Sequence, residues 1–568
     1  MAQSKNFTLE GNILDPVNRR SGYGHVRVEE GRILEVVISG PEQTDQPYIL
    51  PGFVDAHIHI ESSMLTPPAF ARMAVRHGTV ATVSDPHEIA NVCGIEGVRY
   101  MVDLGKKSGF KFFFGAPSCV PATSFETAGA TLTVEEIIQL FEEKSCCYLS
   151  EMMNYPAVLA RDPLVMDKIA ATQRFGLPVD GHAPGLKGKD AQRYASAGIT
   201  TDHECTTLEE ALDKIDAGMH IIIREGSAAK NFNALHPLIG LHHEKVMLCS
   251  DDKHPDDLMQ GHINQLVARC LTHGYDLMDV LTIACVNPVR HYQLHVGLLQ
   301  PGDPADMIMV HDIHQCKVIS TWLNGTQVFD GESVHLPAIK IPIINSFGID
   351  PITPDALRLE LRNGPAKMIV AIDGAIVTEH EEFLMNEGLF ESDPARDILK
   401  LVVINRYRKA PPAIALIKGF GLKNGAIATS VAHDSHNIIA VGTNDRDLAA
   451  CINQVIEAKG GLCALGRMEG IPEHMDTPTM ATFEFEAMAY KSICVPLPVG
   501  GLMSDSPDGE TIGKLYSAAD RLSKKWLGST LTAPFMTLSF MALLVIPSLK
   551  LSDLGLFDGN SFRFTAIQ

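Results

Sequence analysis

Histidines and carboxylates recur in this chain where short apolar runs end. In the first of these runs, Asp55-Ala-His57-Ile-His59, alternate residues of an extended strand share a face, so the two imidazoles point to the same side. Neutral imidazoles together with carboxylates, and without a thiolate, suit Zn, Mn or Fe. The candidate metal ligands at the ends of such runs are His57, His59, Glu151, His182, His203 and Asp251.

These candidates divide into two half-sites, and Glu151 is placed to bridge them. Two divalent ions roughly 3.5–4 Å apart can share a hydroxide, because metal binding lowers the pKa of water towards ~7. Asp251, beside that hydroxide, can accept a proton and later pass it to the leaving group. The pattern therefore predicts a hydrolase with a binuclear metal centre. One half-site is His57, His59 and Asp251, and the other is His182 and His203.

A second polar cluster, Ser84-Asp-Pro-His-Glu88, follows another apolar run. Pro86 ends that strand, so we expect the polar side chains on a loop at the same face as the metal centre. A carboxylate that faces the metal centre across a cavity could act as a general acid. Asp85 and Glu88 are therefore candidate substrate-binding residues, and Glu88 is also a candidate catalytic residue. The alternative is that either carboxylate caps the following helix.

Two further motifs are less informative. His433-Asp-Ser-His436 could bind a metal or a polar ligand, or it could be a hydrogen-bonded loop without such a role. The stretch from Gly509 to Lys514 has three residues between its glycines, where a P-loop needs four.

The elements that would position these residues alternate along the chain. Between about 51 and 292, short apolar strands alternate with amphipathic stretches such as 134–141, which is apolar at 134, 137, 138 and 141. Eight such strand–helix units match a (β/α)8 TIM-like barrel, in which the carboxyl ends of the strands form the active-site face. A doubly wound α/β sheet is the alternative, but no G-x-G-x-x-G follows the first strand.

The flanks differ from this middle region. Residues 1–50 and 293–340 contain short strands and turns, and we expect them to form one small β domain together. The catalytic barrel would then occupy residues 51–292. After a Pro-rich linker, residues 345–568 mix strands and helices and would form an additional C-terminal α+β domain.

Composition narrows the possible partners and the location. Lys and Arg number 47 against 68 Asp and Glu, a net charge of −21, which argues against nucleic-acid binding. The start has no signal-peptide pattern, and no run of 18 apolar residues suggests a membrane segment. The 12 cysteines do not follow a disulfide scaffold and are expected to be reduced. We expect a cytoplasmic homo-oligomer that acts on a small molecule.

Together, these motifs resemble the adenine deaminase family of the amidohydrolase superfamily. The run from Pro51 to His59 is typical of the superfamily as a whole, whereas the combination of motifs is more specific. One stretch, 467–491, is longer than the family pattern leads us to expect and unlike it. The other matching runs are residues 57–63, 85–89, 151–153, 180–182, 224–229, 250–252, 419–422, 433–437 and 501–504, and the resemblance extends to 557–559.

The resemblance implies the hydrolysis of adenine to hypoxanthine and ammonia. It implies two divalent ions, with Mn(II) preferred, Fe(II) second and Zn(II) third. Glu151 fits the position where many relatives use a carboxylated lysine, and Asp85 and Glu88 match positions expected to contact the purine. Protonation of the ring as hydroxide attacks C6 would spread the developing negative charge.

Two alternatives share much of this pattern. Another amidohydrolase, acting on a cyclic amide or a different amino-heterocycle, would have the same metal ligands and differ in the loops around the substrate. A non-catalytic scaffold on the same fold should have lost ligands, and none of the six candidates is lost here.

Overall fold

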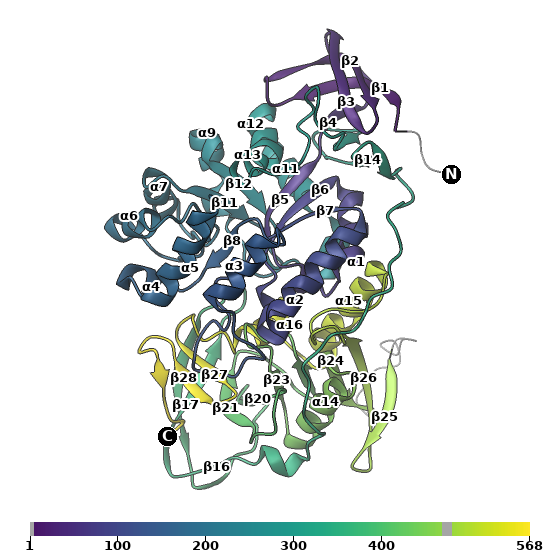
Figure 1. The fold of residues 1–568 in the computed structure, drawn as a ribbon. Coiled ribbons are helices and arrows are strands. Elements are labelled where there is room, and N and C mark those ends of the chain that lie inside the picture. The colour runs from purple at the N-terminus through teal and green to yellow at the C-terminus, as the bar shows by residue number, and fades with distance from the viewer. Residues whose placement is uncertain (1–4, 469–479) are drawn as a thin grey trace.

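The computed structural model describes residues 5–468 and 480–568 (Figure 1). Residues 469–479, part of the stretch that departs from the family pattern, lie outside the described residues. Helices and strands are mixed throughout, as predicted for an α/β protein. Among the described helices, none has both the length and the apolar content needed to cross a membrane.

A seven-stranded sheet is built from strands that lie before and after the predicted barrel region of residues 51–292. Its strand order is β15-β14-β13-β4-β1-β2-β3, and the antiparallel pair β13–β4 joins the late strands to the early ones. Ile13, Val26, Met307 and Trp322 pack in its own apolar core. The strands are β1 (Phe7–Asp15), β2 (Arg20–Glu29), β3 (Arg32–Gly40), β4 (Tyr48–Pro51), β13 (Met307–Val310), β14 (Val318–Leu323) and β15 (Thr326–Phe329).

Eight short parallel strands follow β4, within the region of about 51–292 where strand–helix units were expected. Their sheets are β5-β6-β7, β8-β9 and β10-β11-β12. Parallel bridges link Ala116 to Leu149 and Ile58 to Asp251, and Thr200 N donates to Val179 O at 2.8 Å, so the last strand lies beside the first. The strands are β5 (Phe53–Ile58), β6 (Thr79–Ser84), β7 (Lys111–Phe114), β8 (Leu149–Met152), β9 (Val179–Gly181), β10 (Thr201–Asp202), β11 (His220–Arg224) and β12 (Val246–Cys249).

Amphipathic helices connect these strands and pack around them. The predicted helix at 134–141 is α3, which begins with a capping box between Thr133 and Glu136 and buries Ile137 and Leu140. The helices are α1 (Pro67–Ala74), α2 (His87–Ser108), α3 (Val134–Glu142), α4 (Tyr155–Ala160), α5 (Pro163–Arg174), α6 (Gly188–Ser196), α7 (Leu208–Asp216), α8 (Phe232–Leu235), α9 (Leu238–His242), α10 (Pro255–Gln260), α11 (Ile263–Thr272), α12 (Leu277–Leu281) and α13 (Asn287–His291).

The last part of the chain is built on a nine-stranded sheet, in the order β18-β17-β21-β20-β23-β22-β24-β26-β25. Helix α14 (Asp445–Glu457) packs on this sheet, whereas α15 (Gly509–Lys525) and α16 (Pro534–Phe540) lie between the sheet and the eight-strand region (Figure 1). The strands are β17 (Gly364–Ala371), β18 (Thr378–Met385), β20 (Leu399–Ile404), β21 (Ala413–Lys418), β22 (Ala426–Thr429), β23 (Ile438–Gly442), β24 (Gly461–Arg467), β25 (Ala481–Phe485) and β26 (Met488–Pro496).

Two smaller sheets complete the last part of the chain. One pairs β16 (Glu360–Leu361) with β19 (Gly388–Leu389). The other has the order β27-β28-β29, from β27 (Leu549–Ser552), β28 (Gly555–Asp558) and β29 (Arg563–Phe564).

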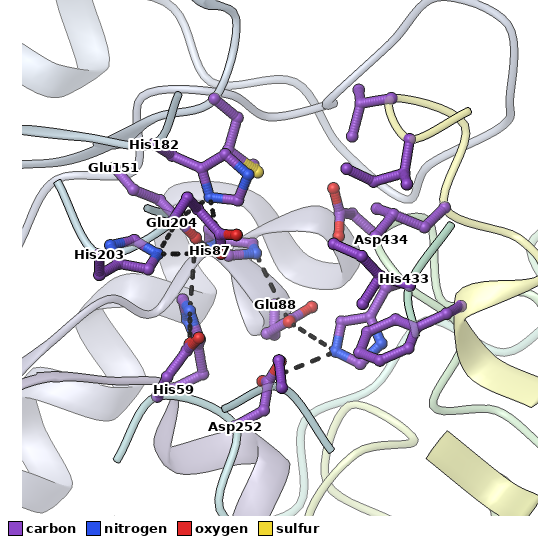
Figure 2. A pocket seen from close by; sticks show the side chains of 18 of the residues that line it. His59, His87, Glu88, Glu151, His182, His203, Glu204, Asp252, His433 and Asp434 are labelled. Atoms are coloured by element: carbon purple, nitrogen blue, oxygen red, sulfur yellow. Dashed lines mark hydrogen bonds and ion pairs between the residues drawn. The ribbon is translucent and has the colours of Figure 1, made fainter. Parts of the chain in front are cut away.

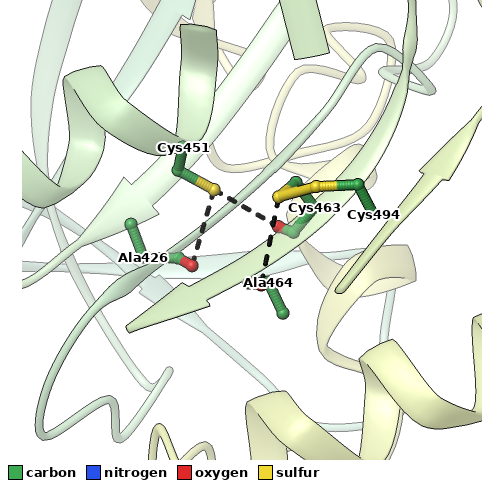
Figure 3. The surroundings of a disulfide bond; sticks show 5 residues. All are labelled: Ala426, Cys451, Cys463, Ala464 and Cys494. Carbon is green, nitrogen blue, oxygen red and sulfur yellow. Dashed lines mark hydrogen bonds between the residues drawn. A yellow bond between two sulfur atoms is a disulfide. The ribbon is translucent and has the colours of Figure 1, made fainter. Parts of the chain in front are cut away.

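The expectation of reduced cysteines is wrong for one pair. Cys463 and Cys494 form a disulfide, because antiparallel pairing of β24 with β26 places them directly opposite each other, with Cα atoms 4.1 Å apart (Figure 3). The thiol of Cys451 donates to the carbonyl oxygen of Cys463 at 3.3 Å. The two bonded cysteines are 31 residues apart, so only the strand register brings them together.

Lys550 of β27 is a buried amine that ties together two segments of the last part of the chain. Its Nζ donates to the carbonyl oxygens of Ile376 at 2.7 Å and Phe540 at 3.0 Å. Burial lowers the pKa of Lys550 from 10.5 to about 7, because neither acceptor carries a charge to offset the loss of water.

We predict that Lys550→Met changes how stability depends on pH. Between pH 7 and 10.5 the folded protein holds this amine neutral while the unfolded chain protonates it. The unfolded state therefore binds more protons in that window, and this group makes stability rise with pH by at most about 1.4 kcal/mol per unit. The melting temperature of the wild type minus that of the variant should grow from about pH 7 to about pH 10.

The exposed Lys525→Met is the matched control and should give a difference that does not vary with pH. A difference for Lys550→Met that is flat across the same range would contradict a neutral amine.

Candidate metal centre

His57 and His59 meet Asp251 where the first of the eight strands lies beside the last. The Nε2 atoms of the two histidines are 3.2 Å apart. Asp251 Oδ1 lies 3.1 Å from Nε2 of His59 and 3.6 Å from Nε2 of His57. Asp251 has a φ of 51°, in the left-handed region that residues other than glycine rarely adopt and that is found at functional sites. The backbone therefore holds this carboxylate against the two imidazoles.

Glu151, in β8, lies between the two groups of histidines. Its Oε1 is 3.3 Å from Nε2 of His59. Its Oε2 is 2.6 Å from Nδ1 of His182 and 3.2 Å from Nε2 of His203, which follow β9 and β10. One carboxylate thus contacts both of the half-sites expected from the sequence, with a different oxygen atom toward each.

The donor atoms of this cluster fit divalent cations. The Nε2 atoms of His57 and His59 lie 3.2 Å apart and both are within 3.6 Å of Asp251 Oδ1, an arrangement in which one divalent cation could bind all three atoms. Nδ1 of His57 and Nδ1 of His203 are buried without a hydrogen-bond partner, and the two rings stack with centroids 4.0 Å apart. A buried set of imidazoles and carboxylates suits Zn, Mn or Fe.

The two carboxylates of the cluster are held in the charged form. Burial alone would raise the pKa of Glu151, but His182, His203 and His59 hold it well below its usual range. Burial likewise opposes ionisation of Asp251, and the Arg224 guanidinium together with His59 holds its pKa well below the usual range. Both groups are therefore available as anionic ligands.

Arg224 and Glu204 lie beside the cluster, although the spacing of ligand-type residues in the sequence pointed to neither. Arg224, at the end of β11, donates through Nη1 to Asp251 Oδ2 at 2.7 Å and also pairs with Glu204. Glu204 Oε1 lies 3.7 Å from Nδ1 of His182 and 3.6 Å from Nε2 of His203. The sequence did contain one indication for Glu204, because this residue directly follows His203 at the end of a strand. Glu204 and Arg224 thus connect the two half-sites.

Asp85, a candidate substrate-binding residue, is buried beside the metal cluster, and its carboxylate lies within 4.8 Å of donor atoms of His59, His87 and Glu151. Its Oδ1 accepts from the backbone N–H of His87 at 3.1 Å, and its Oδ2 is 3.0 Å from Nδ1 of the same residue. Helix α2 begins directly after Pro86, so the carboxylate is used at the start of the helix. His87, which the spacing argument did not select, has its Nδ1 3.5 Å from Oε1 of Glu151.

Glu88 lines the cavity next to the metal cluster, and histidines from far along the chain surround it (Figure 2). Nε2 of His433 is 3.1 Å from Glu88 Oε1, and His436 pairs with Oε2. Burial would raise the pKa of Glu88, but His433, His87 and His436 hold it well below its usual range. The motif at 433–436, for which the sequence left two alternatives open, therefore lies at the cavity.

The wall of the cavity opposite the metal cluster comes from the last part of the chain. Figure 2 shows Asp434 and His433 on one side and His59, Glu151, His182 and His203 on the other. The remaining residues of this wall are apolar, and no spacing pattern in the sequence pointed to them. They are Ile376, Phe540, Leu543, Val545 and Ile546.

Both halves of the chain match known protein families. Residues 48–328 match the family described as "Amidohydrolase family", and residues 375–473 and 489–563 match "Adenine deaminase C-terminal domain". Three proteins named "Adenine deaminase" are similar over nearly their full length. They come from Sulfurovum sp. (50% identity over 559 residues, 98% of each chain), Salinibacter ruber (47% over 561 residues, 98% of each) and Parabacteroides distasonis (46% over 569 residues, 100% of each).

We predict that Glu151→Gln lowers metal content at both half-sites. The amide keeps the size of the side chain but removes the charge, and each oxygen of Glu151 contacts a different group of histidines. Elemental analysis after reconstitution should give less than half the metal bound by the wild type, with the fold intact by circular dichroism.

The exposed Glu135→Gln, on α3, is the matched control and should bind metal as the wild type does. If a crystal structure of Glu151→Gln showed only one half-site depleted, the bridging position would be wrong.

Proposed function

The chain belongs to the amidohydrolase family and, within it, to the adenine deaminases, and from this we propose that it hydrolyses adenine to hypoxanthine and ammonia. The observation that carries the proposal is the position of Glu151 between two groups of histidines, beside a cavity that Glu88 lines. A purine in this cavity would have its C6 carbon next to the metal cluster and a carboxylate within reach of a ring nitrogen.

We assign the six residues predicted from the strand ends as ligands of two divalent ions. Bound there, the ions would lower the pKa of water and supply a hydroxide nucleophile at neutral pH. Mn(II) is our first choice, followed by Fe(II) and then Zn(II). The ligands are His57, His59, Glu151, His182, His203 and Asp251.

Asp251 is proposed to move the proton of the nucleophile. One of its oxygens faces His57 and His59, while the other accepts from Arg224, which fixes the orientation of the carboxylate. In this position Asp251 can take a proton from water and give it to the departing amine, whose expulsion as ammonia requires protonation. Arg224 does not contact the reacting atoms in this scheme and acts through Asp251.

Glu88 is proposed to contact the purine ring and to move a proton at a ring nitrogen. His433 and His87 hold it as a carboxylate, so it must accept a proton before it can donate one. Protonation of the ring nitrogen would relieve the negative charge that develops as C6 is attacked. Asp85 is proposed as a second purine contact, and its contacts with the backbone N–H and Nδ1 of His87 would hold its carboxylate in position.

We also propose domain boundaries, partners and a cellular location for the chain. We propose a (β/α)8 barrel at 51–292, a small β domain from 1–50 and 293–340, and a C-terminal α+β domain at 345–568. The strand orders of the sheets support these boundaries. A net charge of −21 supports a small-molecule substrate without nucleic acid or membrane, and we propose a cytoplasmic homo-oligomer.

The direct test is ammonia release from adenine by metal-depleted protein reconstituted with Mn(II), Fe(II) or Zn(II). We expect hypoxanthine and ammonia in equal amounts, with the highest rate for Mn(II). A panel of cyclic amides and other amino-heterocycles tests the alternative amidohydrolase activity. Turnover of a panel compound with none of adenine would overturn the proposal.

We predict that Glu88→Gln lowers kcat and kcat/KM together by ~10²–10⁴ while leaving metal content unchanged. The amide can still hydrogen-bond to a purine but cannot carry the proton. Glu96→Gln, an exposed change on the same helix, is the matched control and should leave kcat unchanged. A large fall in melting temperature with kcat intact would instead show that Glu88 serves only the start of the helix.

A further inference from the structure

The loop between β22 and β23 carries a carboxylate into the cavity from the far end of the chain. It is firmly held, because His433 Nδ1 lies 2.5 Å from Ser539 Oγ and the Tyr407 hydroxyl donates to Ser435 O at 2.5 Å. Asn437 Nδ2 donates to Thr127 O at 2.9 Å, which ties the loop to the eight-strand region. Asp434 therefore has a fixed position on the cavity wall.

Asp434 has an oxygen atom without a partner. The side chain lines the cavity and is 3% exposed, and its Oδ2 is buried with no hydrogen-bond partner. A buried carboxylate oxygen is costly to leave unpaired, so its occurrence in a well-anchored loop calls for a ligand that donates to it.

The surroundings of Asp434 favour a flat, mostly apolar ligand with one N–H group. Phe540, Ile376 and Val545 line the same wall, and Asp434 is the one carboxylate that the last part of the described chain contributes to the cavity. In Figure 2 this wall faces the metal cluster across the pocket. A ring that reacts at the cluster would thus present its opposite end to Asp434.

We propose that Asp434 is a specificity-determining residue that accepts a hydrogen bond from the imidazole N–H of the purine, at N9. This inference rests on the proposed function, because deamination requires C6 to lie at the metal cluster and N9 lies at the other end of the ring system. A purine with a substituent at N9 has no proton there, so Asp434 would stay buried and unpaired. The protein would therefore select free bases over nucleosides and nucleotides.

The size of the selection follows from the cost of an unmatched polar group. Sites built to hydrogen-bond one group of the substrate reject analogues without it by roughly 10⁴–10⁵. The carboxylate stays on the protein when the N–H is absent, so the discrimination depends on Asp434 itself and should shrink when the carboxylate is removed.

The test compares adenine with 9-methyladenine as substrates and, for 9-methyladenine, also as a competitive inhibitor. Reconstituted wild type, Asp434→Ala and Asp434→Asn are measured, with Asp393→Asn, at a half-buried position outside the cavity, as the matched control. In Asp434→Ala, kcat/KM for adenine should fall roughly 10- to 100-fold. The inhibition constant of 9-methyladenine should fall or stay constant, so the preference for adenine should shrink at least about tenfold. Asp434→Asn keeps an acceptor oxygen and should lie between alanine and wild type.

Several outcomes would overturn the assignment. If the preference for adenine over 9-methyladenine stayed the same in both variants while adenine turnover fell, Asp434 would not be the group that contacts N9. Loss of metal in the variants would make Asp434 a ligand, since its carboxylate lies within 4.8 Å of donor atoms of His87 and Glu88. A wild type that releases no ammonia from adenine would instead refute the proposed function, which distinguishes the two failures.

Discussion

The burial of many imidazoles and carboxylates in one small space is the constraint on which the rest of the structure depends. Glu151 stands at its centre, with one oxygen toward His59 and the other toward His182 and His203. Such a cluster is stable only if each charge is matched by an opposite charge or by a cation, because burial without compensation strongly disfavours ionised groups. Arg224, which lies beside the cluster, compensates negative charge there by pairing with both Asp251 and Glu204.

The eight parallel strands meet this constraint because their carboxyl ends converge. Five of the eight strands, β5, β8, β9, β10 and β12, bring a candidate ligand to the same face, while the strands themselves are short and almost wholly buried. The backbone contribution is clearest at Asp251, whose positive φ and bridge to Ile58 turn the carboxylate toward His59. A strained residue is tolerated there because the neighbouring strands fix its conformation.

The strand ends were predictable from the sequence because alternation in a strand and position at its end are local properties. The H-x-H pair and Glu151 follow from such local patterns, and their observed contacts agree with the half-sites drawn from them. The contact of Asp85 with His87 was not predicted, because it depends on where the next helix begins. The contacts of His433 with Glu88 and the disulfide of Cys463 depend on tertiary packing and strand register, which no local pattern contains.

The two parts of the chain line the cavity with different kinds of side chain. The eight-strand region supplies the charged face, where metal ligands and Glu88 would act on the reacting carbon. The last part supplies a mainly apolar wall, and from it His433 compensates the charge of Glu88. Without His433, the charge of Glu88 would be opposed mainly by His87, and a buried carboxylate with less compensation favours its neutral form. The charge state of a residue on α2 therefore depends in part on a loop more than 340 residues later in the chain, so the active site is complete only when both parts are folded together.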